Sequence, residues 1–506
     1  MIPRSLTEIA AMVGAVPTDL VAERAPAVPA AGGPGTDVVT GVVTGVVTDV
    51  ITDSRRAGPG CLFVAIAGQR TDGHAHLGQV ARAGGTAALV SDPQAARAAL
   101  EREGGGQDLP LLVVPDTVEA LGALARGHLA DLRERAVRRG RALTVVGMTG
   151  SVGKTTTKDL TRQLLAAQGP TIAPVASFNN EIGLPMTVLG AEESTRYLVL
   201  EMGASGPGHI DYLTDIAPLD AAAVLMVGHA HMGGFGSVEG VAAAKAEILR
   251  GLVPTGTAVL NRDDPRALAM AELAPARVLT FSAAGDPEAE LRATGVRLGD
   301  RAHASFDLHL PGLPGPQHLT LALPGGHNVS NALAAAGLAL AAGADPRDLV
   351  EALAQARIES PHRMDVGLVE RPAGQVLLLD DSYNANIDSM TAALRSLPVV
   401  AGRRPTVVVV SEMLELGESA RADHALAGRI AGEVGARLVV GIGAGTDPLL
   451  QEAARAGART VLMTDAQEAV ASIDDLLLDG DAVLVKGSQG SGAWRVADHL
   501  KEATDR

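Results

Sequence analysis

The stretch ALTVVGMTGSVGKTTTKDLTRQLLAAQG, residues 142–169, decides the fold of this chain. Its first seven residues are mostly apolar and predict a buried strand over 142–148. TGSVGKT then forms a glycine-rich loop, and TTKDLTRQLLAAQG predicts a helix closed by Gly169. Strand, glycine loop and helix in this order are the context that a phosphate-binding loop requires.

The residues of this loop have the chemistry that nucleotide phosphates need. Gly150 and Gly153 let backbone N–H groups approach the phosphates, and the helix N-terminus adds roughly half a positive charge. Lys154 supplies a full positive charge, and the Thr155 hydroxyl is a suitable ligand for Mg²⁺. We therefore expect a nucleotide to be bound by Gly150, Ser151, Val152, Gly153, Lys154, Thr155 and Thr156.

The glycine spacing departs from the Walker A pattern, which has a glycine five residues before Gly153. Met148 occupies that position here, and the glycines stand instead at 147 and 150. The alternative interpretation is a glycine-rich turn followed by a chance Gly-Lys-Thr. Nucleotide binding is the stronger prediction, because strand, loop, lysine and helix all agree with it.

Composition limits the class of protein. The 506 residues predict about three domains, and 47% apolar with 20% charged residues is typical of a soluble globular protein. A net charge of −16 and very few aromatic residues argue against a nucleic-acid-binding protein. The single Cys61 excludes an internal disulfide framework and a Cys-based zinc site.

Three further features concern location and charge. No stretch of 18 apolar residues is free of charges or helix breakers, so we expect no membrane span. The start, MIPRSLTEIA, predicts Ser5 as the N-cap of a helix rather than a signal peptide, which indicates a cytoplasmic protein. Lysine is scarce beside arginine, which makes each of these positions worth examining: 154, 158, 245, 486 and 501.

The first domain is expected to span residues 1–140. Residues 24–36 are rich in proline, alanine and glycine and predict a loop. The repeat VVTGVVTGVVTDVITD (38–53) predicts a single strand with a duplicated lead-in. A long helix over 117–139 ends in arginines, which suit the negative end of a helix dipole.

The second and third domains are expected to span 141–357 and 358–506. The second continues with further strands, a β-rich segment near 290–323 and a helix over 327–343. In the third, five strand-like runs alternate with helices, which predicts a doubly wound, Rossmann-like parallel sheet. The carboxyl ends of its strands, where ligands of such sheets bind, carry DDSYN (380–384), SEMLELGE (411–418) and KGS (486–488). The fold class is therefore α/β, with a central P-loop domain and a smaller α/β domain before it.

The shifted loop TGSVGKTT resembles that of the Mur ligase superfamily, ATP-dependent enzymes that form amide bonds. Other segments resemble motifs of that family in its order along most of the chain: EMGASGPGHI (201–210), HAHMGGFGSVEGVAAAKAEI (229–248), GGHNVSNALAA (325–335), PHRMDV (361–366) and VLVKGS (483–488). One branch of the family is most similar, through DSRRAGPGCLFVAIAGQRTDGHAH (53–76), SFNNEIGLP (177–185) and DDSYNANIDSM (380–390) with SEMLELGE.

The resemblance implies a reaction and its ligands. That branch adds D-alanyl-D-alanine to UDP-N-acetylmuramoyl-tripeptide, using ATP and Mg²⁺ and passing through an acyl phosphate. It completes the cytoplasmic peptidoglycan precursor, with no nucleic acid or membrane span involved, and we expect a monomer. The alternatives are another amide ligase of the superfamily, adding the third residue or acting as a folylpolyglutamate synthase, or a P-loop switch or transport ATPase. The last would hydrolyse ATP without any UDP-sugar.

The resemblance also assigns roles to residues. The implied catalytic residues are Lys154, His231, Lys245 and Arg363, and the implied metal ligands are Thr155, Glu201, His231 and Lys245, the last as a carbamate. Further ATP contacts are Asn261, His327, Asn328, Asn331 and Asp381. The UDP-substrate would meet Ser54, Arg55, Thr71, His74, Asn179 and Asn180, and the acceptor side comprises Asn384, Asn386, Lys486 and Ser488. Asp53 and Asp72 are expected to be turn residues.

Without the resemblance, ordinary interpretations stay open for several of these residues. Glu201 would be a ligand or a solvated strand end, and His231 a structural histidine. Lys245 would be a helix-surface lysine paired with Glu247 or with no partner, and His327 with Asn328 would simply cap a helix. The chain departs from the family pattern at His209, Ile387, Ser411–Glu412 and Gln489, mostly on the acceptor side.

Overall fold

A computed structural model describes residues 1–15, 45–68, 71–102, 109–228, 235–299 and 302–502. These residues form two compact units. The first comprises 1–143, 178–198 and 215–217, and the second comprises 144–177, 199–214 and 218–506. No helix in the described ranges is long and apolar enough to cross a membrane.

The first unit contains a four-stranded parallel sheet of short, aliphatic strands. The order is β3 (Asp49–Ile51), β4 (Cys61–Val64), β5 (Ala87–Val90) and β6 (Leu111–Val113). Helices α2 (Leu77–Arg82) and α3 (Pro93–Arg102) follow β4 and β5 along the chain. Their apolar faces close a core that includes Phe63, Leu77 and Ala96.

The described part of the VVT repeat, from Gly45 on, forms two strands, so the prediction of a single strand is wrong there. Within it, β2 (Val46–Val47) pairs antiparallel with β1 (Arg4–Ser5). After Thr48, β3 pairs parallel with β4 in a different sheet. The Thr48 and Asp49 amides both donate to the Gly60 carbonyl, at 2.8 and 3.2 Å, and this bend lets one apolar run serve two sheets.

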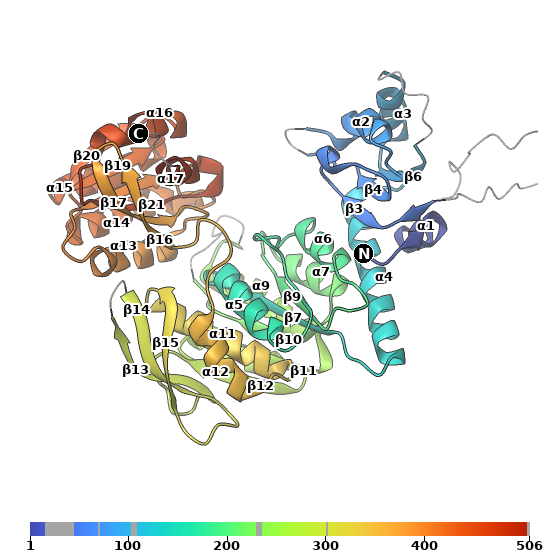
Figure 1. Cartoon of the computed structure of the whole chain (residues 1–506), viewed down its shortest axis with the longest axis horizontal. Helices are drawn as coiled ribbons and strands as arrows, with labels where there is room; N and C mark the ends of the chain where they lie inside the picture. Colours follow the sequence, from blue (N-terminus) through green and yellow to red (C-terminus); the bar gives the residue numbers. More distant parts are fainter. Residues whose placement is uncertain (16–44, 69–70, 103–108, 229–234, 300–301, 503–506) are drawn as a thin grey trace, which may run out of the picture. The chain divides into compact units, whose positions relative to one another are not determined.

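Two helices at the ends of the first domain pack together, as Figure 1 shows. Ser5 caps α1 (Leu6–Val13) in a capping box with Glu8, as predicted. The long helix α4 (Thr117–Arg138) contacts α1 and also α6 (Gly183–Leu189). The arginines at its end meet carboxylates as well as the helix dipole: Arg135 pairs with Asp131 and Glu193 at 3.0 and 2.8 Å.

The second unit begins with a nine-stranded sheet whose middle strands are parallel. In sheet order it comprises β15 (Gln317–Pro324), β14 (His303–His309), β13 (Leu291–Leu298), β12 (Arg277–Ser282), β11 (Leu252–Asn261), β10 (Leu219–Val224), β7 (Thr144–Thr149), β9 (Tyr197–Glu201) and β8 (Thr171–Ile172). β13, β14 and β15 form an antiparallel extension, which is the predicted β-rich segment.

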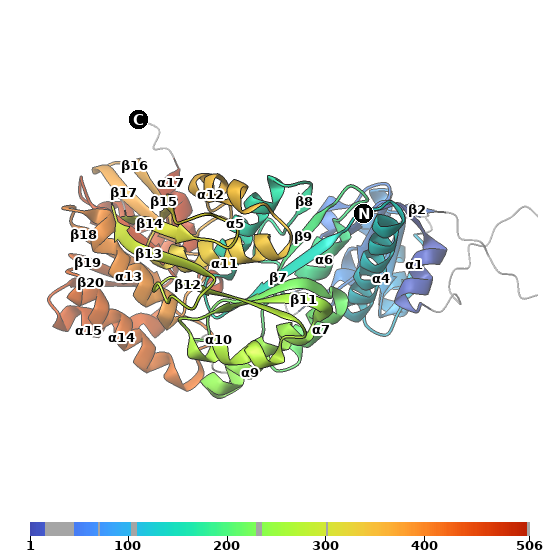
Figure 2. The same cartoon turned by 90° about the horizontal axis from the view of Figure 1, so that it is seen from below.

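Helices cover this sheet and include the predicted helix after the glycine loop. That helix, α5 (Lys154–Ala166), packs against α11 (His327–Ala341), as Figures 1 and 2 show. It ends at Ala166 with Ala167 as its cap, so the expected closure at Gly169 lies two residues too late. The other helices here are α7 (His209–Ile216), α9 (Val238–Arg250), α10 (Pro265–Ala269) and α12 (Pro346–Gln355).

The last part of the chain is the predicted doubly wound sheet. Its order is β16 (Asp365–Arg371), β17 (Gly374–Asp381), β21 (Ala482–Lys486), β18 (Thr406–Ser411), β19 (Leu438–Ile442) and β20 (Arg459–Met463). One face packs on α13 (Ile387–Ala401), α14 (Ala420–Glu433) and α15 (Asp447–Arg455), the other on α16 (Ala466–Leu476) and α17 (Trp494–Lys501).

Sequence reasoning missed two elements of this domain, β16 and α17. β16 is the antiparallel edge strand, and most of its residues are exposed or half-buried, including Leu368. It therefore lacks the continuous apolar run of a buried parallel strand. The buried Arg371 at its end binds Asp474 and donates to carbonyls of α17, which fixes the last helix against the sheet.

We expect acid to destabilise the first unit through His128. This residue is fully buried, its Nε2 lies 2.9 Å from the Ala191 carbonyl, and burial lowers its pKa to about 4. Between pH 6.5 and 4 the unfolded chain binds a proton that the folded unit excludes. The free energy of unfolding therefore decreases as the pH is lowered through this range, by about 3 kcal/mol at most. His128→Gln should flatten this pH dependence in thermal unfolding followed by circular dichroism.

The matched control for this prediction is His318→Gln, which changes an exposed histidine paired with Asp307. It should leave the pH dependence of unfolding as in the unaltered protein. An equally steep acid loss in His128→Gln would show that other groups cause it.

Candidate active site

The glycine loop has the geometry of a phosphate cradle. Gly153 is the N-cap of α5 with φ +86°, and a Cβ there would collide with the Asn331 side-chain oxygen. The Ser151 amide donates to the Met226 carbonyl at 2.9 Å, which fixes the loop to the end of β10. The free N–H groups of the first turn of α5 are therefore held in one orientation, as an anion site requires.

Lys154 lies at the start of α5, and its ammonium donates to the Gly150 carbonyl at 2.7 Å. Burial lowers its pKa below the ordinary value; Glu201 opposes that shift, and Arg363 adds to it. Because the charges of Glu201 and Arg363 both affect the Lys154 ammonium, we assign the three side chains to one site at the loop. An anionic ligand bound there would relieve the crowding of the two cations.

Glu201 ends β9 and is buried beside the loop. The Met202 amide donates to the Met148 carbonyl at 2.9 Å, which sets the end of β9 next to the end of β7. The Ser177 hydroxyl donates to Glu201 at 2.5 Å, so this carboxylate is not the solvated strand end of the ordinary interpretation. Its oxygens and the Thr155 hydroxyl are hard donors of the kind that Mg²⁺ prefers.

A metal site made by the described protein alone would be incomplete. Among the residues that the structure describes, no cluster of three or more His, Cys, Asp or Glu side chains could hold a metal ion. His231, the other histidine ligand implied by the sequence, lies outside the described residues, as does His229. The donors at hand fit a cation completed by phosphate oxygens and water.

Lys245 is buried on α9, only 4% exposed, so its interpretation as a surface lysine is wrong. Burial lowers its pKa well below the ordinary value, and the charge of Lys154 lowers it further. Its supposed partner, Glu247, is engaged elsewhere: this carboxylate accepts the amides of Gly208, Ile210 and Asp211 at the start of α7. Lys245 is therefore a buried amine whose pKa is lowered by burial and by the charge of Lys154.

Arg363 reaches the loop from the segment that joins the second and third domains. Its Nη2 donates to the Thr155 hydroxyl at 3.0 Å, and its guanidinium lies 4.2 Å from the centre of the Tyr383 ring. The Nε of this side chain is buried and has no hydrogen-bond partner among the described residues. Arg363 therefore adds a second fixed positive charge next to the P-loop threonine.

The start of α11 faces the same loop. Gly326 is its N-cap and no side chain caps it, so simple capping by His327 and Asn328 is wrong. Asn328 donates to the Pro324 carbonyl at 2.8 Å, and Asn331 donates to Asn328 at 2.9 Å. This chain of amides directs the oxygen of Asn331 towards Gly153.

Other implied nucleotide residues hold strand ends in place. Asn261 donates to the Leu225 carbonyl at 2.8 Å and accepts the Asp263 amide, which ties β11 to β10. Asp381, at the end of β17, pairs with Lys486 at 2.6 Å. His327 is exposed.

The acceptor-side residues form one network at the carboxyl ends of β17, β21 and β18. The buried Lys486 donates to the carbonyl of Asn384 at 3.0 Å in addition to Asp381. Ser488 accepts the Leu414 amide at 3.0 Å, and Asn386 caps α13. The loops that the sequence singles out at this edge are thus brought together.

The residues expected to meet the UDP-substrate lie in the first unit. Asp53 and Asp72 cap short turns, as predicted, and the exposed Arg55 pairs with Asp53. Thr71 lies 3.1 Å from the ring of His76. Ser54 contacts Gln79, the Asn180 side-chain oxygen accepts the amides of Ile182 and Gly183 at 3.3 and 2.9 Å, and Asn179 is the neighbouring residue in that loop.

His74 is placed differently from the other five. It is 2% exposed, and both of its ring nitrogens are engaged, Nδ1 with Asp72 at 2.6 Å and Nε2 with the amides of Ser91 and Asp92. No ring nitrogen remains for a ligand in this arrangement. His74 fixes the loop that carries Thr71.

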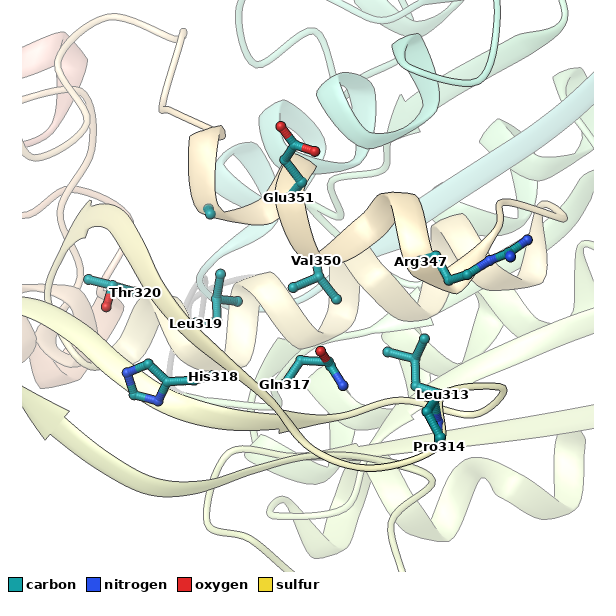
Figure 3. Close-up of a pocket in the computed structure, with 10 residues that line it drawn as sticks. Leu313, Pro314, Gln317, His318, Leu319, Thr320, Arg347, Val350 and Glu351 are labelled. Carbon is teal, nitrogen blue, oxygen red and sulfur yellow. The ribbon is translucent and has the colours of Figure 1, made fainter.

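A separate hollow lies between β15 and α12, as Figure 3 shows. Its volume is about 480 Å³, and apolar side chains such as Leu313, Leu319 and Val350 line it with a polar rim. None of the residues expected to bind ligands lines it, so it is distinct from the phosphate loop.

Three family models match successive parts of the chain. They are described as Mur ligase family, catalytic domain (46–129), Mur ligase middle domain (148–339) and Mur ligase, glutamate ligase domain (362–489). A UDP-N-acetylmuramoyl-tripeptide–D-alanyl-D-alanine ligase of Mycobacterium tuberculosis is 38% identical over 88% of this chain and 91% of its own length. The chain belongs to the Mur ligase family.

Other relatives support the assignment of this chain to the Mur ligase family. A ligase of the same name from Escherichia coli is 34% identical over 89% of this chain and 92% of its own length. A crystal structure of MurF from Acinetobacter baumannii has a TM-score of 0.79 and 28% identity, covering 99% of both chains. MurF of Thermotoga maritima, in complex with ADP, has a TM-score of 0.70 and 25% identity over 90% of this chain and 97% of its own. The predicted family and α/β fold class are confirmed.

Two departures of this Mur ligase from the family pattern have a local explanation. Ile387, where the family has proline, is the first residue of α13, a position where proline is tolerated but not required, and Asn386 still provides the cap. His209, where the family has glutamate, begins α7, and the carboxylate of Glu247 occupies that helix start instead.

The other departures lie on the acceptor side. The Ser411 hydroxyl lies 2.7 Å from that of Ser491, and Glu412 accepts the Gly445 amide at 2.7 Å. The Gln489 carbonyl accepts the indole N–H of Trp494 at 3.2 Å. These side and main chains join neighbouring loops at the carboxyl edge of the sheet.

Sequence reasoning missed three residues of this site. Ser177 binds Glu201, Tyr383 stacks on Arg363, and the buried Thr149 hydroxyl at the start of the loop has no partner among the described residues. Ser177 and Tyr383 stand inside quoted motifs, SFNNEIGLP and DDSYN, and Thr149 directly precedes Gly150. Their position beside motif residues was the available signal.

Lys154→Ala is expected to reduce ATP turnover by at least about a hundredfold, because it removes the positive charge aimed at the outer phosphates. Phosphate release measured with a coupled assay tests this. The thermal unfolding midpoint should stay close to that of the unaltered protein, which separates loss of chemistry from loss of fold. Wild-type turnover in this variant would refute the assignment of the loop.

Proposed function

We propose that this Mur ligase joins D-alanyl-D-alanine to UDP-N-acetylmuramoyl-tripeptide at the expense of ATP, as a cytoplasmic monomer. The observation that carries the proposal is the set of side chains around the P-loop: Lys154, Glu201, Lys245 and Arg363. The names of the relatives in Mycobacterium tuberculosis and Escherichia coli support the choice of acceptor.

Three domains, spanning 1–140, 141–357 and 358–506, would each bind a different substrate. The four-stranded, nine-stranded and six-stranded sheets each lie within one of these ranges, which supports the boundaries. The first would hold the UDP-sugar, the second ATP, and the third the incoming dipeptide.

Joining a carboxylate to an amine requires activation of the carboxylate. Transfer of the γ-phosphate of ATP to the tripeptide carboxylate would give an acyl phosphate and ADP. Attack by the dipeptide amine would then form the amide and release phosphate. Phosphoryl transfer between two anions needs positive charge fixed in advance, which Lys154, Arg363 and the amides of the loop would provide.

Thr155 and Glu201 would hold Mg²⁺ against the nucleotide, with His231 serving a second ion. When bound, Mg²⁺ would neutralise charge on the phosphate oxygens. Of the remaining proposed ATP contacts, Asn331 would stay next to Gly153, while Asn261, His327, Asn328 and Asp381 would surround the nucleotide from strand ends and the start of α11.

Lys245 would act as a carbamate. Its lowered pKa favours the neutral amine, which is the form that attacks carbon dioxide. The amine nitrogen would bond to the carbon of carbon dioxide and lose one proton to solvent. The product is an anionic oxygen donor suited to a hard metal ion, and its negative charge would interact favourably with the charge of Lys154.

On the sugar side, we assign contacts to Ser54, Arg55, Thr71, Asn179 and Asn180, and we assign to His74 the role of holding the loop of Thr71. On the acceptor side, Asn384, Asn386, Lys486 and Ser488 would shape the dipeptide site.

Phosphate release should require ATP, UDP-N-acetylmuramoyl-tripeptide and D-alanyl-D-alanine together. We expect omission of any one substrate to abolish release, because the acyl phosphate forms on one substrate and is consumed by another. Measuring phosphate with each substrate left out in turn checks this. Release that continues without the dipeptide would contradict the ligase assignment and favour an ATPase.

Lys245→Ala should lose most activity, and added acetate or formate should restore part of it by replacing the carboxylate-like donor. The assay is the same phosphate release, with and without the small carboxylate. Lys154→Ala in the same buffers is the control, since no carboxylate can replace its positive charge. Full activity of Lys245→Ala without rescue would exclude the carbamate.

A further inference from the structure

A buried pair of charges lies outside the proposed catalytic set. Lys158 and Asp159 follow Thr155 on α5, and each is only 1% exposed. The Lys158 ammonium lies 2.7 Å from the Asp159 carboxylate. Charged side chains are rarely buried this completely unless a specific arrangement depends on them.

The other bonds of this pair converge on the segment between the second and third domains. Asp159 Oδ2 accepts the amides of Glu359 and Ser360 at 3.0 and 2.9 Å, and its Oδ1 accepts the Ser360 hydroxyl at 3.1 Å. Lys158 donates to the Ser360 hydroxyl oxygen at 3.0 Å and to the Pro174 carbonyl at 2.7 Å. Ser360 is therefore anchored to the P-loop helix through its amide and its hydroxyl.

The segment is also held beyond this anchor. His362 and Met364 have φ of +59° and +47°, a conformation that non-glycine residues keep only where their surroundings hold it. The His362 ring lies 2.8 Å from Asp380, which Lys501 also binds. The Met364 amide donates to Asp381 at 3.3 Å.

Arg363 stands between these two points of attachment. Thr155 and Asp159 are four residues apart on α5 and so share one helix face. Arg363 is three positions after Ser360, a reach of roughly 10 Å. With Ser360 fixed one helical turn from Thr155, the residue that comes to lie against the Thr155 hydroxyl is Arg363.

We propose that Lys158 and Asp159 are positioning residues for Arg363. They set the register of the interdomain segment on the P-loop helix and thereby place the guanidinium at the nucleotide. This inference rests on the proposed function for its activity measurements. The competing explanation is a strut that only joins two domains, without any effect through Arg363.

A double-mutant cycle separates the two explanations. Asp159→Asn should lower kcat/KM for ATP about tenfold or more, since it weakens the bonds that hold Ser360. In an Arg363→Ala background the same change should alter kcat/KM less than about twofold, because no guanidinium is left to misplace. Additive effects of the two changes would overturn the proposal.

Glu359→Gln is the matched control. Glu359 lies on the same interdomain segment as Ser360, and the change breaks its exposed ion pair with Arg162 of α5 but leaves Asp159 intact. It should keep wild-type kcat/KM. Should Asp159→Asn fail to fold in circular dichroism, Ser360→Ala, which removes only the hydroxyl bonds, replaces it in the cycle with the same expected non-additivity.

Hydrogen exchange tests the anchor without any substrate. The amides of Glu359 and Ser360 should exchange slowly in the wild type and in Arg363→Ala, and faster in Asp159→Asn. Faster exchange without loss of turnover would overturn the positioning role. A wild type that releases no phosphate in response to the dipeptide would instead contradict the proposed function. The exchange rates of the Glu359 and Ser360 amides would still show whether Asp159 holds this segment.

Discussion

The left-handed turn at Gly153 is the constraint on which the rest of the site depends. It ends the loop that follows β7 and starts α5 in a fixed direction, and α5 carries Lys154, Thr155 and Asp159 in order along one helix. Asn331 fills the space that any Cβ would need at that turn. Two helices far apart in the sequence are thus locked together at the point where a phosphate would bind. A larger residue at 153 would have to displace the Asn331 side chain as well as adopt an unfavourable backbone conformation.

Charge poses the second constraint, since a chain with a net charge of −16 has to attract anionic ligands. In the described structure, positive charge is concentrated at the glycine loop. Lys154 and Arg363 are held close enough to affect each other, and Glu201 partly offsets them. Lys245, buried nearby, loses its proton more readily than an exposed lysine would. The overall acidity therefore says little about this site, where a few cations are concentrated by placing them on adjacent strand and helix ends.

Sequence reasoning recovered what depends on local pattern. The strand, loop and helix over 142–169, the alternation after residue 358 and the caps at Ser5, Asp53 and Asp72 all follow from short-range chemistry. Contacts between distant segments did not follow. That Asp159 holds Ser360, that Asn331 meets Gly153 and that His74 turns inward all depend on packing across the fold. The edge strand β16 is not predicted from the sequence, because most of its residues are exposed or half-buried and it therefore lacks a continuous apolar run.

The five lysines have a practical consequence. Lys158, Lys245 and Lys486 are buried, Lys154 is partly covered by its loop, and Lys501 is engaged with Asp365 and Asp380. Reagents that acylate primary amines thus meet almost no unengaged lysine in the part of the chain that the structure describes, since Lys501, the most exposed of the five, is paired with two carboxylates. Amine labelling would then report on opening of the structure more than on its surface. Cross-linking or immobilisation of this protein through amines would depend mainly on Lys501 and the N-terminus.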